Sequence, residues 1–123
     1  TYAPFWVRLD DATTSPASLA LTSIVATDGA PVGNAANLSW DVVALADGDA
    51  CDVDGVAAGE SMGSGLTLTS NAAVTGAEQS LAIGTTDGEA GAPVPLCFAI
   101  TASDDLVETG SATATWQLVA TSE

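Results

Sequence analysis

The sequence has almost no positive charge. It contains no lysine and no histidine, and Arg8 is the only basic residue against sixteen acidic ones, which gives a formal net charge of −15. Because one cation cannot neutralise several phosphates, we expect the chain to bind neither nucleic acid nor an anionic membrane surface. Histidine-dependent catalysis, histidine-ligated metals and lysine Schiff-base chemistry are excluded for lack of those residues.

Long apolar runs and aromatic residues are also scarce. No segment of about 18 apolar residues is present, so we expect no membrane insertion. Only six of the 123 residues are aromatic, and 24 are alanine. Hydrophobic residues still make up 47% of the chain, which argues against disorder. The length suits a single domain with a thin core of Val, Leu, Ile and Trp.

We expect no enzymatic activity. Serine nucleophiles have no His or Lys base here, because the chain contains neither residue. The carboxylates of Asp104, Asp105 and Glu108 could act as a glycosidase pair, but a solvated acidic loop is the simpler interpretation.

The clearest secondary-structure signal is alternation of apolar and polar residues. In residues 111–122 the side chains of Ala112, Ala114, Trp116, Leu118 and Ala120 fall on one face, which is typical of a half-buried strand. Residues 95–101 are apolar on both faces, as in a central strand. The predicted strands are residues 2–9, 19–26, 37–45, 51–56, 66–69, 80–83, 95–101 and 111–122.

Turn signals separate these segments, among them Asp47-Gly48, Asp87-Gly88 and the run Gly63-Ser64-Gly65. Seven to eight short strands with regular turns predict an all-β fold, an antiparallel β-sandwich of jelly-roll-like form. We divide the chain into an extended N-terminal segment, residues 1–10, and a single sandwich domain, residues 11–123.

The two cysteines, Cys51 and Cys97, lie 46 positions apart. Since the chain starts at Thr1 without a Met or an apolar leader, we expect a processed, secreted protein. An even number of cysteines in such a chain favours a disulfide, which would stabilise the fold by roughly 2–4 kcal/mol. Two buried free thiols are the alternative.

Four carboxylates lie close together in the sequence at Asp47, Asp49, Asp52 and Asp54. Calcium takes six to eight oxygen ligands, so this segment is a candidate calcium site. Its spacing is not that of an EF-hand loop, and alternation along a strand would send neighbours to opposite faces. A solvated acidic loop without cofactor is the alternative that we favour.

Asn37-Leu38-Ser39 is an N-glycosylation sequon. Asn37 stands at the start of a predicted strand, where a glycan fits poorly. We therefore keep Asn37 as a candidate only.

The N-terminal segment differs in composition from the rest of the chain. It holds half of all the aromatic residues and the only cation. It can form the first strand of the domain's own sandwich, or it can leave its own body and complete a neighbour's sheet. The residues that would then carry polymerisation are Tyr2, Phe5, Trp6, Val7, Arg8 and Leu9.

The C-terminal part of the chain resembles a known family. The strand Leu96-Cys97-Phe98-Ala99-Ile100-Thr101 is followed, after an acidic loop, by Thr113-Ala114-Thr115-Trp116-Gln117-Leu118-Val119-Ala120-Thr121-Ser122. This pattern resembles the C-terminal end of the TasA/camelysin-like secreted proteins, which are exported with SipW-type signal peptides. The match covers about 27 residues.

The resemblance implies a jelly-roll-like sandwich that assembles into extracellular filaments of a biofilm matrix. In such fibres the N-terminal strand of one subunit completes the next, and here that donor would be residues 2–9. The chain departs from the family in its short length and its lack of lysine. The metalloprotease activity described for camelysin-like members does not carry over, because no histidine is present.

Two functions follow as hypotheses. The first is a structural subunit of a secreted filament, with further copies of itself as partners. The second is a monomeric secreted binding module for calcium or carbohydrate that uses the loops around residues 47–54 and 104–108.

Overall fold

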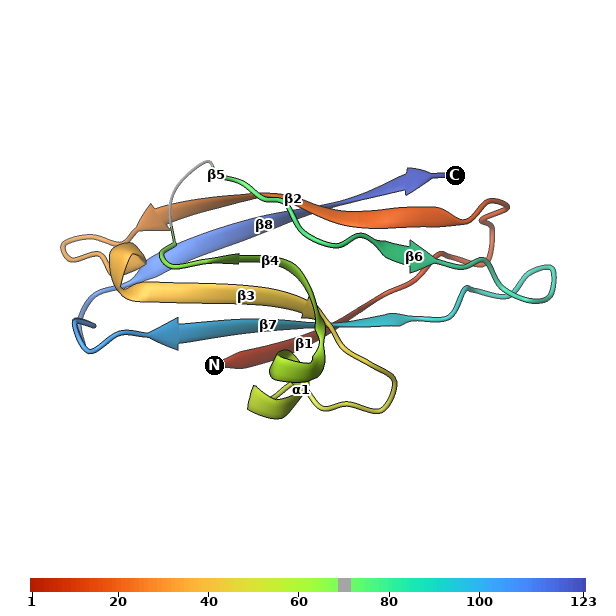
Figure 1. Cartoon of the computed structure of the whole chain (residues 1–123). Helices are drawn as coiled ribbons and strands as arrows, with labels where there is room; N and C mark the ends of the chain where they lie inside the picture. Colours follow the sequence, from red (N-terminus) through yellow and green to blue (C-terminus); the bar gives the residue numbers. More distant parts are fainter. Residues whose placement is uncertain (69–71) are drawn as a thin grey trace.

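The computed structural model describes residues 1–68 and 72–123. Figure 1 shows two layers of strands lying one above the other, with one short α-helix outside them. The elements are β1 (Tyr2–Val7), β2 (Ala17–Asp28), the 3-10 turn η1 (Ala35–Asn37), β3 (Leu38–Ala44), α1 (Val53–Ala58), β4 (Glu60–Gly65), β5 (Ala72–Ala73), β6 (Gln79–Leu81), β7 (Val94–Ala102) and β8 (Ala112–Ser122).

Both layers are antiparallel sheets. The first has the strand order β1-β7-β3-β4, with β7 pairing β3 over Leu38–Ala44. The second is built around β2, which pairs with β8 along its whole length and with the short strands β5 and β6 on its other edge. The predicted all-β antiparallel sandwich is confirmed.

The core lies between the layers and follows the alternation of the sequence. Every second residue of β8 from Ala112 to Leu118 is half-buried and packs against the core. Trp40 of β3 is the most deeply buried aromatic residue, at 3% exposed. A chain of edge-to-face ring contacts runs from Trp40 through Trp116 and Phe98 to Phe5, with centroids 6.0, 5.4 and 5.2 Å apart.

The strand predicted for residues 51–56 is wrong, because the segment turns into helix α1. Asp52 caps this helix: its side chain accepts hydrogen bonds from the backbone N–H groups of Asp54 and Gly55 at 3.1 and 2.9 Å. Gly59 follows the last helical residue. The Asp cap and the glycine after Ala57 and Ala58 were the signals that favour a helix.

Strand β4 was not predicted, since Gly63-Ser64-Gly65 was interpreted as a turn. These glycines lie in the strand because side chains pack closely against them, Val74 against Gly63 and Trp40 against Gly65. A Cβ at Gly65 would lie 2.4 Å from Trp40 Nε1. Of the strand predicted for residues 66–69, residues 66–68 are irregular and Thr69 lies outside the described residues.

A disulfide joins Cys51 to Cys97 of β7, with an S–S distance of 2.01 Å, which confirms the expected pairing. It holds the loop that carries α1 against the outer face of the first sheet, over a small second core of Val43, Leu45 and Cys97. Within the described residues, no helix is long and apolar enough to cross a membrane.

Candidate functional site

The N-terminal segment forms edge strand β1. It pairs with β7 from Tyr2 opposite Ala99 to Val7 opposite Val94. No strand in the described part of the chain pairs with its other edge. In a single chain β1 thus completes its own sheet, as the first of the two alternatives expects.

The side chains of β1 remain largely exposed. Tyr2, Phe5 and Trp6 are 43%, 54% and 64% exposed. Phe5 stands against Phe98, while Val7 and Leu9 pack on the core. A strand with this much apolar exposure is unusual on an isolated monomer and is typical of a surface that meets a partner.

Arg8 follows directly after β1 and is exposed. Although the chain has sixteen acidic residues, Arg8 forms no ion pair with any described residue.

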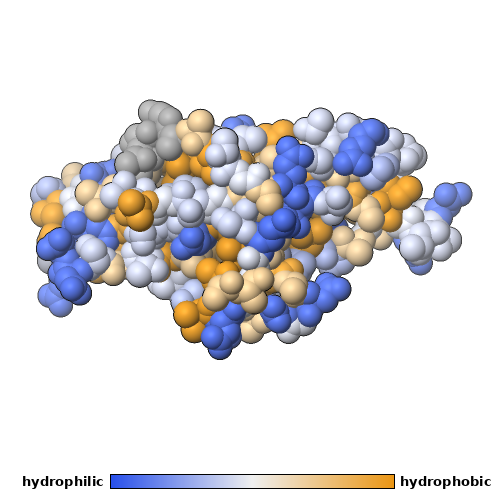
Figure 2. All heavy atoms as spheres, viewed as in Figure 1, coloured by the Kyte–Doolittle hydropathy of each residue, from blue (hydrophilic) through white to orange (hydrophobic). Residues whose placement is uncertain are grey.

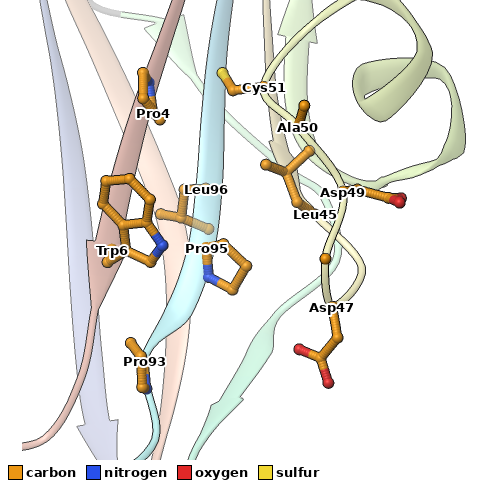
Figure 3. Close-up of a pocket in the computed structure, with 11 residues that line it drawn as sticks. Pro4, Trp6, Leu45, Asp47, Asp49, Ala50, Cys51, Pro93, Pro95 and Leu96 are labelled. Atoms are coloured by element: carbon orange, nitrogen blue, oxygen red, sulfur yellow. The ribbon is translucent and has the colours of Figure 1, made fainter.

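An outer hollow of about 560 Å³ lies between β1, the start of β7 and the loop after β3 (Figure 3). Trp6 stands on one side of this hollow, and Asp47 and Asp49 on the other. The loop is fixed by the disulfide and by the Leu45 N–H, which donates to the carbonyl of Pro95 at 2.9 Å. The remaining lining residues are Pro4, Leu45, Gly48, Ala50, Cys51, Pro93, Pro95 and Leu96.

The four carboxylates of the candidate calcium segment do not converge. Asp52 is engaged in capping α1, and Asp54 lies in the first turn of that helix. Among the described residues no three His, Cys, Asp or Glu side chains form a metal-holding group. Asp104, Asp105 and Glu108 are exposed in the loop between β7 and β8, at the far end of β7 from the outer hollow.

An inner hollow, also of about 560 Å³, opens between the two layers where β1 and β8 form the rim. Its walls are mostly apolar. The indole N–H of Trp116 is buried there and has no hydrogen-bond partner among the described residues. Besides Trp116 and Trp6, the lining residues are Thr1, Ala3, Phe5, Val7, Phe98, Ile100, Ala114, Thr115 and Leu118.

Asn34 is a structural residue that the sequence did not single out. It is 4% exposed, its side chain donates to the carbonyl of Val107 at 2.8 Å, and it accepts from the N–H of Val107 at 3.0 Å. The neighbouring Asn37 is half-buried and its side-chain amide donates to Asn34 Oδ1 at 3.3 Å. The candidate glycosylation nitrogen is therefore engaged within the fold.

Comparison of the chain with protein-family models, with curated proteins and with solved structures found no match.

Proposed function

We propose that the chain is the structural subunit of a secreted extracellular filament that assembles head to tail by exchange of β1. The observation that carries the proposal is the place of β1: it is the N-terminal strand, at a sheet edge, held by β7 alone among the described strands. Such a strand can leave its sheet without disturbing any other pairing. The resemblance to TasA/camelysin-like proteins points the same way.

Exchange keeps the interactions that β1 already makes. A neighbour's β1 would meet β7 with the same register and the same contact of Phe5 with Phe98. The free energy of these contacts is therefore conserved, which is why exchange of identical elements is a low-cost route to assembly. Only the link between β1 and β2 has to change its path.

The link between β1 and β2 can redirect the chain toward a neighbour without breaking a strand or helix. Residues 8–16 belong to no strand or helix. Within the link, Asp10 Oδ1 accepts from the Ala12 N–H at 3.1 Å and from Thr13 Oγ1 at 2.8 Å. Near its two ends, the carbonyls of Leu9 and Pro16 accept from the N–H groups of Gly91 and Glu123, both at 3.0 Å. Because a copy that donates its strand forward leaves its β7 open for the copy behind, the contact repeats without closing and generates a fibre.

A secreted location fits this role. The disulfide between Cys51 and Cys97 is the kind of bond that persists in oxidising compartments. It anchors the loop of α1 to β7, the strand that would receive the donor. The acceptor is thereby braced before a donor arrives.

A cysteine pair across β1 and β7 tests exchange directly. Val7 and Val94 lie opposite each other, close enough for a disulfide when both are cysteine. If filaments of the Val7→Cys, Val94→Cys variant contain exchanged strands, oxidation yields a ladder of covalent multimers on a non-reducing gel. The control is Val25→Cys with Thr115→Cys, opposite each other on β2 and β8 of one subunit, which should give monomers alone.

Deletion of residues 1–9 tests the same role by electron microscopy. We expect the truncated chain to form no filaments, and added peptide of residues 1–9 to bind it and block open β7 edges. Intact filaments after the deletion, or filaments of the Val7→Cys, Val94→Cys variant that oxidise only to monomers, would refute the donor role.

The outer hollow supports a second candidate function, a carbohydrate-binding module. Trp6 offers an exposed aromatic face, and no hydrogen bond engages the side chains of Asp47 and Asp49 within the described structure. An indole face stacks on the apolar side of a sugar ring, while carboxylates accept from its hydroxyl groups.

Calorimetric titration with neutral disaccharides, and separately with calcium, tests this candidate on chain shown by light scattering to be monomeric. A carbohydrate-binding module gives saturable heat with a disaccharide that Trp6→Ala removes. An absence of heat with both ligands, together with filaments, leaves the structural role alone.

A further inference from the structure

We infer that the free edge of β8 is a second self-association surface, which pairs antiparallel with the same edge of another copy about a two-fold axis at Gln117. The inference does not depend on exchange of β1, because it uses a different strand in the other sheet. The partner is a second copy of this chain, and the product is a dimer or a lateral contact between filaments.

The edge of β8 is open and carries no protective feature. β8 has eleven residues and pairs with β2 throughout, whereas no described strand pairs with its other side. Natural proteins protect such edges with proline, charged residues or bulges. β8 contains no proline and no charge, and the irregularity in the pairing lies in β2 at Thr22.

The edge is also where the negative charge of the chain is absent. No charged residue occurs between Glu108 and Glu123. Elsewhere the acidic residues are spread along the chain from Asp10 to Glu108. Figure 2 colours hydropathy, not charge, and in its view strongly hydrophilic residues lie at both ends of the molecule, along its lower rim and in a strip across its middle. Because two copies repel each other through fifteen net charges apiece, an uncharged edge is the surface where they approach at the least electrostatic cost.

The sequence of β8 is self-complementary around its centre. When Gln117 lies opposite Gln117 of the other copy, Thr113 meets Thr121 and Thr115 meets Val119 on the outer face. On the inner face Trp116 meets Leu118. Pairs of threonines, of β-branched residues and of an aromatic with an aliphatic residue are favourable cross-strand neighbours. In this register no carboxylate faces another, since Glu123 falls opposite Ser111.

Groups at the inner hollow also favour association of two copies along β8. Trp116, on the rim formed by β8, holds a buried indole N–H that no group in the described part of the chain accepts from, and Phe5 on the opposite rim is 54% exposed. An unsatisfied buried donor and an exposed ring are both unfavourable in an isolated molecule. A second copy against this flank covers the opening and the exposed ring of Phe5.

Gln117→Glu tests the two-fold axis, because it places two like charges opposite each other only in this register. The variant should still fold: a glutamate retains the Oε1 atom that accepts from Ser23 Oγ at 3.2 Å in the native chain. We expect sedimentation equilibrium to show a wild-type dimer whose dissociation constant rises at least tenfold in Gln117→Glu. The matched control, Thr101→Glu, adds the same charge at an exposed position of β7 and should change the dissociation constant less than threefold.

Gln117→Cys is the positive test. Two cysteines that meet on the axis should form an intermolecular disulfide on mild oxidation, whereas Thr101→Cys should remain monomeric under the same conditions. The inference is overturned if the wild-type chain stays monomeric at all ionic strengths, if Gln117→Cys cross-links no better than Thr101→Cys, or if both glutamate variants weaken the dimer equally. The Val7→Cys, Val94→Cys ladder is read separately, so failure of β1 exchange and failure of β8 pairing are distinguishable.

Discussion

At the scale of single residues, Asn34 makes the side-chain hydrogen bonds that fix a distant loop, and composition does not reveal this role. Asn34 lies buried before η1 and satisfies both backbone groups of Val107, 73 positions further along the chain. Its side chain therefore fixes the loop between β7 and β8 to the body of the domain. Nothing in its local sequence distinguishes it from a turn asparagine.

Replacing Asn34 by alanine should destabilise the domain by about 1–3 kcal/mol, because the N–H and C=O of Val107 lose their partners. The measurement is urea denaturation followed by tryptophan fluorescence. Asn37→Ala is the control. This variant loses a single long side-chain hydrogen bond of 3.3 Å and should therefore lose less unfolding free energy. Equal midpoints for the two variants would show that the Val107 bonds contribute little.

Arg8 is the residue that tests electrostatics in assembly. It has no ion-pair partner among the described residues of its own chain, while every potential partner chain carries sixteen acidic residues. We expect Arg8→Glu to slow filament growth, followed by light scattering, and to leave the thermal unfolding temperature of the monomer almost unchanged. Arg8→Lys should restore growth. A drop in monomer stability without any change in growth would place Arg8 in the fold instead.

At the scale of elements, local chemistry overrode strand propensity in the segment after the acidic turn. Asp52 accepts two backbone N–H groups and starts a helix where alternation predicted a strand. The disulfide at Cys51 then fixes this helical loop to β7. The loop is therefore a brace on the outer face of the sheet that carries β1.

Loss of the disulfide should show what this brace contributes. In the Cys51→Ala, Cys97→Ala variant we expect a loss of roughly 2–4 kcal/mol of unfolding free energy, measured by chemical denaturation. The native chain under reducing agent should approach the same midpoint. The control is the double variant with and without reducing agent, whose denaturation midpoint should not change. A change there would show that the reducing agent acts on stability by a route other than the disulfide.

At the scale of the whole molecule, the charge of −15 opposes every association between copies. The acidic residues lie mainly in loops and at the ends of strands, and the edges of β1 and β8 are free of them. Association through these edges therefore separates the attractive surfaces from the repulsive ones. Salt weakens the repulsion without weakening strand pairing.

Assembly should consequently strengthen with ionic strength. We expect the critical concentration for filament growth, measured by light scattering, to fall as sodium chloride is raised from about 10 mM to 1 M, where the screening length shortens from roughly 30 to 3 Å. Sodium sulfate at matched ionic strength is the control for specific ion effects. Filament growth that is fastest at low salt would contradict the view that charge repulsion between copies limits assembly.

The sequence alone determined much of this fold. Alternation in β8, apolar residues on both faces of β7 and two cysteines in an acidic chain are local or countable features, and they predicted the sandwich, the central strand and the disulfide. Strand β4 was not predictable in this way. Its glycines are explained by the side chains of Val74 and Trp40, and these contacts exist only after the chain has folded.

The tertiary structure alone decided which surfaces are free. The sequence identifies apolar strands, but a strand's neighbours depend on pairings between residues far apart in the chain. These pairings place β1 at one edge and β8 at another, open the hollow between them and leave the Trp116 N–H without a partner among the described groups. Burial and edge position are properties of the assembled sheets, and for that reason the candidate interfaces emerge only from the fold.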